Sequence, residues 1–195
     1  MTPRLLRHLR GNTDGAAVIE FAFAAPVMLI AIMGIFDLSH NMYTASILQG
    51  SIQEAARDAT IEGASTTDID AYVTDIVHNV SPGANVTFFR SAYTNFKEVH
   101  QPEDFTDVNT NGTCDSGEPY FDENENGKWD PDKGQYNSGN ARDAVFYEVT
   151  VNFKRLFPIG KLIGQSEYFT VKSATVLRNQ PYGLQSTAGM NGNCT

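Results

Sequence analysis

A long stretch of almost entirely apolar residues lies near the start of the chain. The sequence AAVIEFAFAAPVMLIAIMGIF, residues 16–36, contains a single charged residue, Glu20. A helix rises about 1.5 Å per residue, so a helix of this length spans the roughly 30 Å hydrocarbon core of a bilayer. The pattern predicts a transmembrane helix over residues 16–36.

The spacing of residues after Asp37 predicts that this helix continues outside the membrane to about residue 62. Mostly small or apolar residues recur there at alternating intervals of four and three positions, which places them on one face of a helix. They are Asn41, Ala45, Leu48, Ile52, Ala55 and Ala59. Gly63 is the expected end of the helix, because glycine readily adopts the left-handed conformation that often follows a helix.

A second, shorter helix is predicted over TTDIDAYVTDIVHNV, residues 66–80, with Thr67 as its N-cap. Three later segments are rich in β-branched and aromatic residues, which favours strands: NVTFFRSAY, AVFYEVTVNFKRL and EYFTVKSATVL. The stretch FPIGKLIGQ is a turn-rich link between the last two, and the tail QSTAGMNGNCT is expected to be loose. We therefore expect an α+β fold, in which a long N-terminal helix packs on a small antiparallel sheet.

Charge gives this arrangement an orientation. Arg4, Arg7 and Arg10 precede the apolar run, and the positive-inside rule keeps such a cluster in the cytoplasm. The anchor would then be a single pass of the inner membrane, with the C-terminal domain periplasmic or extracellular. A cleaved signal peptide, an uncleaved signal anchor and a buried soluble helix are the alternatives. The apolar run is longer than the 7–15 residues typical of a signal peptide, and no small-residue cleavage site follows it.

Glu20 is out of place in a plain membrane anchor. A carboxylate within a bilayer costs about 2.5–3.5 kcal/mol at the centre and less near the edge, so such a residue usually has a function. No Lys or Arg lies within the apolar run to pair with it. Cleavage after Gly15 would create an α-amine on Ala16, and the amine of one subunit could pair with Glu20 of a neighbour.

These residues carry a family resemblance. GAAVIEF after a short basic leader resembles type IV prepilins, and GAAVIEFAFAAPVMLIAIMGIFDLS resembles the opening of TadE-like proteins of the tight-adherence (Flp-type) pilus system. The resemblance covers residues 11–62 and returns weakly in VKSATVLRNQPY. It implies a pilin-like fold, with Gly15 as the last leader residue, Ala16 as the mature N-terminus and Glu20 as the assembly carboxylate. It also implies a prepilin peptidase as a partner, and contacts with other pilins or pilus-assembly subunits through the N-terminal helix.

A second motif, DVNTNGTCDSGE, follows the twelve-residue EF-hand-like calcium loop D-x-N-x-N-G-x-x-D-x-x-E. Ca²⁺ takes six to eight oxygen ligands, and this spacing offers them at alternate positions. The predicted ligands are Asp107, Asn109, Asn111, Thr113 through its carbonyl, Asp115 and Glu118. Gly112 permits the sharp turn, and a solvated acidic turn without an ion is the alternative.

The segment DENENGKWDPDK repeats the same pattern and could form a second calcium site. Its ligand positions are Asp122, Asn124, Asn126, Lys128 through its carbonyl, and Asp130. The twelfth residue, Lys133, cannot bind a cation, but Asp132 could replace it if the loop shortens. Only three residues separate the two loops, too few for the flanking helices of an EF-hand pair.

The acidic residues and cysteines restrict the function further. Residues 101–133 contain ten acids against two lysines, which accounts for most of the formal net charge of −9 and argues against nucleic-acid binding. Bound calcium would allow this segment to be ordered. Cys114 and Cys194 could form a disulfide in an oxidising compartment. The histidines, serines and glycines show no catalytic motif, so we do not expect an enzyme.

The predicted organisation is a basic leader (1–15), a transmembrane helix (16–36), its periplasmic extension (37–62) and a pilin-like α+β domain (63–195) with an acidic calcium-loop insertion (101–134). Two functions fit it. The first is a non-enzymatic minor pilin or pseudopilin that takes part in assembly of a type IVb pilus, anchored in membrane lipid before assembly. The alternative is an uncleaved, membrane-anchored calcium-binding module that acts as an adhesin or scaffold.

Overall fold

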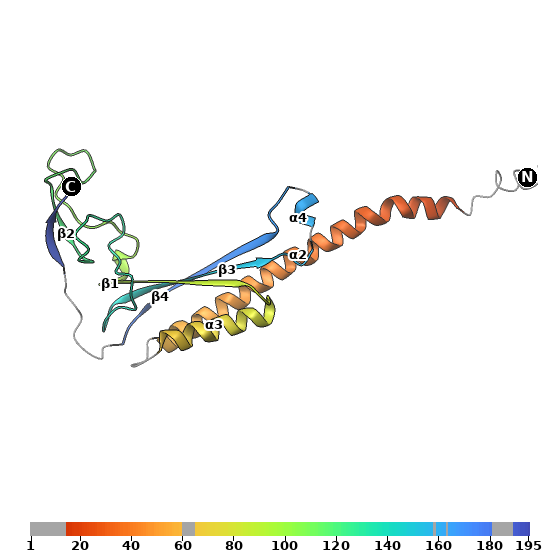
Figure 1. Cartoon of the computed structure of the whole chain (residues 1–195), viewed down its shortest axis with the longest axis horizontal. Helices are drawn as coiled ribbons and strands as arrows, with labels where there is room; N and C mark the ends of the chain where they lie inside the picture. The colour runs from red at the N-terminus through yellow and green to blue at the C-terminus, as the bar shows by residue number, and fades with distance from the viewer. Residues whose placement is uncertain (1–14, 60–64, 158, 163, 181–188) are drawn as a thin grey trace, which may run out of the picture. The chain divides into compact units, whose positions relative to one another are not determined.

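The computed structural model describes residues 15–59, 65–157, 159–162, 164–180 and 189–195 (Figure 1). The chain divides into two compact units, one made of residues 1–42 and 154–169 and the other of residues 43–153 and 170–195. The elements confirm the predicted fold class, since a long apolar N-terminal helix accompanies a small antiparallel sheet.

The first unit contains the whole apolar run of helix α2 (Ala16–Ala59). The large apolar side chains of this part are exposed, among them Phe23 at 79% and Val27 at 70%. The helix is long and apolar enough to cross a membrane, and none of its most apolar stretch is buried within the chain. Pro26 lies inside the helix without ending it. Short helix α4 (Ile159–Leu162) belongs to the same unit.

The second unit begins with the C-terminal part of α2, whose buried face follows the predicted stripe. Leu48 and Ile52 are fully buried, and Ala55 is 1% exposed. Helix α3 (Thr66–Val80) runs beside this part of α2, as Figure 1 shows, and the hydroxyls of Thr44 and Ser81 lie 3.4 Å apart at one end of the pair. Burial of each large aliphatic side chain contributes about 1.5–3 kcal/mol to such packing.

Helix α3 has the predicted bounds but a different N-cap. The Ser65 hydroxyl accepts a hydrogen bond from the Asp68 backbone N–H at 3.3 Å, and Ser65 has an extended backbone. Thr67 is already the second helical residue, so the prediction that it caps the helix was wrong. Either hydroxyl could accept this bond by residue type, and only the backbone conformation distinguishes them.

Three strands form the main sheet of the second unit, in the order β1 (Asn85–Tyr93), β3 (Ala144–Lys154), β4 (Tyr168–Arg178). Strands β1 and β3 are antiparallel, with Asn85 opposite Asn152 and Tyr93 opposite Ala144. Burial alternates along β3, where Val149 and Val151 are fully buried. This period of two is the pattern that predicted the strand.

A second sheet holds the acidic segment. Strand β2 (Pro119–Asp122) pairs antiparallel with β5 (Met190–Asn193), and a 3₁₀ helix, η1 (Phe96–Glu98), precedes the loops. The expectation of a loose tail was therefore wrong for residues 190–193, while residues 181–188 lie outside the described residues. MNGN has no strand pattern of its own and is extended because β2 supplies its hydrogen-bond partners.

Candidate functional site

The first candidate site is the start of α2. Gly15 immediately precedes the helix, and its carbonyl accepts a hydrogen bond from the Ile19 N–H at 3.1 Å. Glu20 is exposed one turn into the helix, between the exposed side chains of Ile19 and Phe21. Ala16 and Glu20 are four residues apart, so they lie on the same helix face. A carboxylate thus faces outward from an apolar surface, within one turn of the bond after Gly15.

The first acidic loop, residues 107–118, is organised around the carboxylate of its first residue. Asp107 Oδ1 accepts a hydrogen bond from the Asn111 N–H at 3.1 Å, and Oδ2 accepts one from the Gly112 N–H at 2.7 Å. Gly112 has a φ of 78°, which a residue with a side chain rarely adopts. The side-chain oxygen of Asn111 accepts from the Thr113 N–H at 2.8 Å.

The second half of this loop turns back toward the first. Asp115 Oδ2 accepts hydrogen bonds from Nδ2 of Asn109 at 2.7 Å and Nδ2 of Asn111 at 2.6 Å, and these bonds lower the pKa of Asp115. Glu118 is buried, and its two oxygens accept from the N–H groups of Val108 at 2.8 Å and Asp115 at 3.0 Å. Hydrogen bonds therefore link the predicted side chains of the first loop to one another and to the loop backbone.

The second acidic loop, residues 122–133, repeats these contacts position by position. Asp122 accepts from the N–H groups of Asn126 at 3.2 Å and Gly127 at 2.7 Å, as Asp107 does in the first loop. The Lys128 N–H donates to Asn126 Oδ1 at 2.8 Å. The side-chain amides of Asn124 and Asn126 both donate to Asp130 Oδ2. Gly127 has a φ of 79°, matching Gly112.

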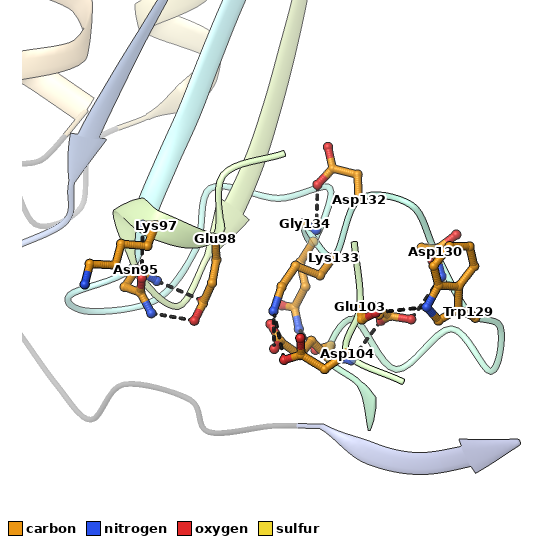
Figure 2. A network of polar contacts seen from close by, with 12 residues as sticks. Asn95, Lys97, Glu98, Glu103, Asp104, Trp129, Asp130, Asp132, Lys133 and Gly134 are labelled. Carbon is orange, nitrogen blue, oxygen red and sulfur yellow. Dashed lines mark hydrogen bonds and ion pairs between the residues drawn. The ribbon is translucent and has the colours of Figure 1, made fainter. Parts of the chain in front are cut away.

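The twelfth position of the second loop is filled from elsewhere in the chain. Glu103 Oε1 accepts from the Glu123 N–H at 2.9 Å, and Oε2 accepts from the Asp130 N–H at 3.0 Å. These are the second and ninth residues of the loop, the same two positions that Glu118 contacts in the first loop. Glu103 is 1% exposed, and burial raises the pKa of its carboxyl. Figure 2 shows it beside Asp130 and Trp129.

Sequence reasoning missed Glu103 because it precedes both loops and belongs to neither motif. Its placement depends on backbone pairing: the Glu103 N–H donates to the Asp130 carbonyl at 3.0 Å, and the Glu103 carbonyl accepts from Trp129 Nε1 at 2.9 Å. No local pattern in HQPEDF distinguishes this glutamate from the acids around it. Only the three-dimensional return of the chain identifies it.

Asp132, the residue predicted to complete the second loop, makes other contacts. Its carboxylate accepts from Tyr93 Oη at 3.1 Å, lies 2.9 Å from His100 Nδ1 and accepts from the Gly134 N–H at 3.1 Å. Figure 2 shows Asp132 directed toward Gly134, while Glu103 points toward Asp130. The structure therefore brings Glu103, rather than Asp132, to the position that corresponds to Glu118.

Lys133 is a buried cation with two acidic partners. Its ammonium lies 3.0 Å from Glu123 Oε1 and 3.4 Å from Asp104 Oδ2, and its side chain is 6% exposed (Figure 2). Burial alone would lower the pKa of Lys133, but the Glu123 and Asp104 carboxylates raise it above its usual value. The lysine at the twelfth position of the second loop thus joins Glu123 of that loop to Asp104, which precedes both loops.

The loops present a mixed set of oxygens rather than a cluster of carboxylates. Among the described residues, no three His, Cys, Asp or Glu side chains are gathered closely enough to hold a metal ion by themselves. At the motif positions of each loop, two asparagine amides follow the first carboxylate and precede the next, and backbone carbonyls complete the possible set. All of these are hard oxygen donors, which fits Ca²⁺ better than zinc or copper.

A disulfide and a strand pair connect the two loops to the C-terminus. Cys114, in the first loop, is bonded to Cys194, with Cα atoms 5.7 Å apart. The Cys194 N–H donates to the Glu118 carbonyl at 2.9 Å, and the Gly117 N–H donates to the Cys194 carbonyl at 2.8 Å. Strand β2 begins directly after Glu118 and ends at Asp122, so β5 braces the last residue of one loop and the first of the next.

The first unit has an ionic contact that sequence reasoning also missed. Asp37 is 4% exposed, and Oδ2 lies 2.8 Å from Arg155 Nη1, while Oδ1 accepts from the Leu156 N–H at 3.2 Å. The Arg155 guanidinium also stacks 3.6 Å above the centre of the Phe169 ring. Asp37, the first residue after the apolar run, is therefore fastened to the connection between β3 and β4.

Comparison with known proteins bears on the first of these regions. No curated protein and no solved structure matches the chain. Residues 15–57 match the family model described as TadE-like protein, so the match starts at Gly15 and covers nearly all of α2. Over this helix, which begins at the predicted cleavage site and carries Glu20, the chain is similar to TadE-like proteins.

Proposed function

We propose that this chain is a minor pilin or pseudopilin of a tight-adherence, type IVb pilus. A prepilin peptidase cuts it after Gly15, and α2 holds the product in the inner membrane with the globular part outside. The mature helix then joins other pilins or pilus-assembly subunits. In this role the protein is structural and catalyses no reaction.

One observation carries this proposal: an exposed apolar helix begins at Ala16, directly after Gly15, has Glu20 on its exposed surface and matches the TadE-like family model from Gly15 onward. A bilayer or the core of a filament would cover that surface. A carboxylate on it is stable when it meets a positive group, and cleavage after Gly15 creates one in each neighbouring subunit. Glu20 thereby sets how far each helix is shifted along the next.

Replacement of Glu20 tests this role separately from membrane insertion. We expect Glu20→Gln to leave cleavage and membrane extraction unchanged, because the variant helix is less polar. The variant should lose co-purification with the other pilus subunits from its own host, since the neutral amide cannot neutralise an α-amine. Glu54→Gln, on the same helix but outside the apolar run, is the matched control. Equal recovery of partners with both variants would contradict the role of Glu20.

We further propose that residues 107–118 bind one Ca²⁺ ion. Support comes from the twelve-residue motif, the left-handed glycine at its sixth position and the hydrogen bonds that link the five predicted side chains within the loop. Asp107, Asn109, Asn111, Asp115 and Glu118 would supply side-chain oxygens and Thr113 its carbonyl. The ion would neutralise part of an excess of acids that otherwise repel one another.

A second Ca²⁺ site is proposed in residues 122–133, with Glu103 as its twelfth-position ligand. Support comes from the equivalence of Glu103 and Glu118, which accept hydrogen bonds from the same two loop positions. Asp122, Asn124, Asn126 and Asp130 would provide the other side-chain oxygens, with the Lys128 carbonyl. Extracellular calcium modules commonly bind with dissociation constants of about 10⁻⁴–10⁻³ M, and these sites need no higher affinity.

Calorimetric titration of the full chain in detergent with CaCl₂ tests both sites. We expect two bound ions for the native chain and one for Asp107→Ala. A chain that binds no calcium below 10 mM would exclude both sites but would leave the pilin proposal standing.

The calcium loops also favour a second function, a membrane-anchored adhesin or scaffold that is not cut at Gly15. This alternative needs no peptidase and leaves Glu20 without a partner. The mass of the mature chain distinguishes it from a pilin, since only the pilin starts at Ala16.

A further inference from the structure

The connection between β3 and β4 forms a small folded segment of its own. Within residues 154–169 the Arg155 N–H donates to the Glu167 carbonyl at 2.9 Å, and the Gln165 N–H donates to the Gly160 carbonyl at 2.7 Å. Arg155 Nε also donates to the Ser166 carbonyl at 2.7 Å. These bonds draw the two arms of the connection together around α4, which Figure 1 shows beside α2.

This connection lies against the last turns of the apolar run. Beside the Asp37–Arg155 contact, the two segments line an open hollow of about 290 Å³. Its walls include Ile30 and Gly34 from α2, and Gly160 and Phe169 from the connection. Ile30 lies seven residues before Asp37, about 10 Å along a helix. A connection that contacts a bilayer-spanning helix from Ile30 to Asp37 lies where the hydrocarbon core meets the lipid headgroups.

The connection has exposed apolar and basic side chains, which are suited to a membrane surface. Leu156 is 55% exposed, and the Lys161 side chain is 66% exposed. A hollow of about 270 Å³ in the connection is lined by Lys154, Arg155, Leu156, Phe157, Gly160, Lys161 and Glu167. Arg155 is neutralised by Asp37, and Lys161 pairs with Glu167. A lysine ammonium has three donors, so Lys161 can bind a second anion beside Glu167.

We propose that this hollow binds the phosphate of anionic phospholipid headgroups. The leaflet concerned is the one that α2 leaves after Phe36. Lys154 and Lys161 contact the phosphate, while Leu156 and Phe157 lie at the boundary with the acyl chains. Basic residues near an anionic surface attract it, and their alkyl stems can pass along apolar surroundings. This inference rests on the proposed membrane anchor. It adds a surface contact that fixes the depth and rotation of the anchored subunit.

The test is hydrogen–deuterium exchange of the full chain in nanodiscs of phosphatidylcholine alone or with 30% phosphatidylglycerol. We expect phosphatidylglycerol to slow exchange in residues 154–167 by up to about 30-fold, because each of two lysines near an anionic surface contributes about 1 kcal/mol. Lys154→Gln with Lys161→Gln should abolish the difference between the two lipids. Lys97→Gln with Lys172→Gln removes the same charge elsewhere and should preserve it. Unchanged exchange in β1 and in residues 144–152 of β3 shows that a variant is folded.

Equal exchange of residues 154–167 in both lipids would overturn the inference, and so would a phosphatidylglycerol effect that survives in the Lys154/Lys161 variant. Alkaline carbonate extraction of the same protein keeps this result separate from the anchor proposal. A chain that resists extraction but ignores phosphatidylglycerol refutes only the headgroup contact. A chain released by carbonate refutes the anchor itself.

Discussion

Glu103→Gln is the sharpest single change in the acidic segment, because it alters a proposed calcium ligand that lies outside both motifs. Without calcium we expect little net change in stability. The variant loses a carboxylate that accepts from the Glu123 and Asp130 N–H groups, but it also removes a buried charge. Hydrogen bonds to a charged group contribute about 1.5–3 kcal/mol each to stability. Burial of a carboxylate costs several kcal/mol in lost hydration, so the two effects of the substitution nearly cancel.

With calcium present, the variant should have a clearly lower free energy of unfolding than the native chain. For a site with a dissociation constant of about 10⁻⁴–10⁻³ M, 10 mM Ca²⁺ stabilises the folded state by about 1.4–2.7 kcal/mol. Loss of the second site removes that increment. For a protein of this size it corresponds to roughly 3–10 °C in melting temperature.

Trp129 makes the assay local. It is the only tryptophan in the sequence, and its Nε1 donates to the Glu103 carbonyl at 2.9 Å. We expect calcium to change the fluorescence of Trp129 in the native chain and in Asp132→Asn, but not in Glu103→Gln. A calcium response that persists in Glu103→Gln and disappears in Asp132→Asn would refute the assignment of Glu103 and restore Asp132 as the ligand.

Three further predictions concern other contacts. Lys133→Glu would complete the twelve-residue motif by sequence, yet we expect it to lower stability and not to raise calcium affinity, because Lys133 faces Glu123 and Asp104; tighter calcium binding by calorimetry would contradict this. In denaturant titrations, Cys114→Ser with Cys194→Ser should lower the free energy of unfolding by about 4 kcal/mol, as expected for a sequence separation of 80 residues. An intact mass of the native chain without the 2 Da loss of a disulfide would contradict the bond. Asp37→Asn leaves the guanidinium of Arg155 without its buried partner, at a cost of about 3–5 kcal/mol, and should speed proteolysis within residues 154–167. The control Asp58→Asn, at an exposed position of the same helix, should not change the rate of proteolysis. Equal rates for the two variants would argue against the contact.

Most of the secondary structure could be predicted because its signals are local. The stripe through Leu48 and Ile52 predicted the buried face of α2, and the alternation along AVFYEVTVNF predicted β3. The first acidic loop has the residues and turn glycine that its motif predicted. In each case a short window of sequence contains both the residues and the spacing that decide the conformation.

What could not be predicted depends on contacts between distant residues. Asp37 and Arg155 are 118 positions apart, and nothing near either residue identifies the other. Strand β5 is extended only because β2 pairs with it, and Glu103 reaches the second loop through backbone pairing with Asp130. The Ser65 cap was missed for a smaller reason, since two neighbouring hydroxyl residues offered the same chemistry.

The central claim is that Glu20 exists to meet an amine made by cleavage after Gly15. The N-terminal sequence and intact mass of the chain, isolated from membranes of its own host, test it most directly. The account predicts a chain that begins at Ala16. A chain that still begins at Met1 would contradict it, leave Glu20 without a partner and favour the uncleaved, membrane-anchored calcium-binding module.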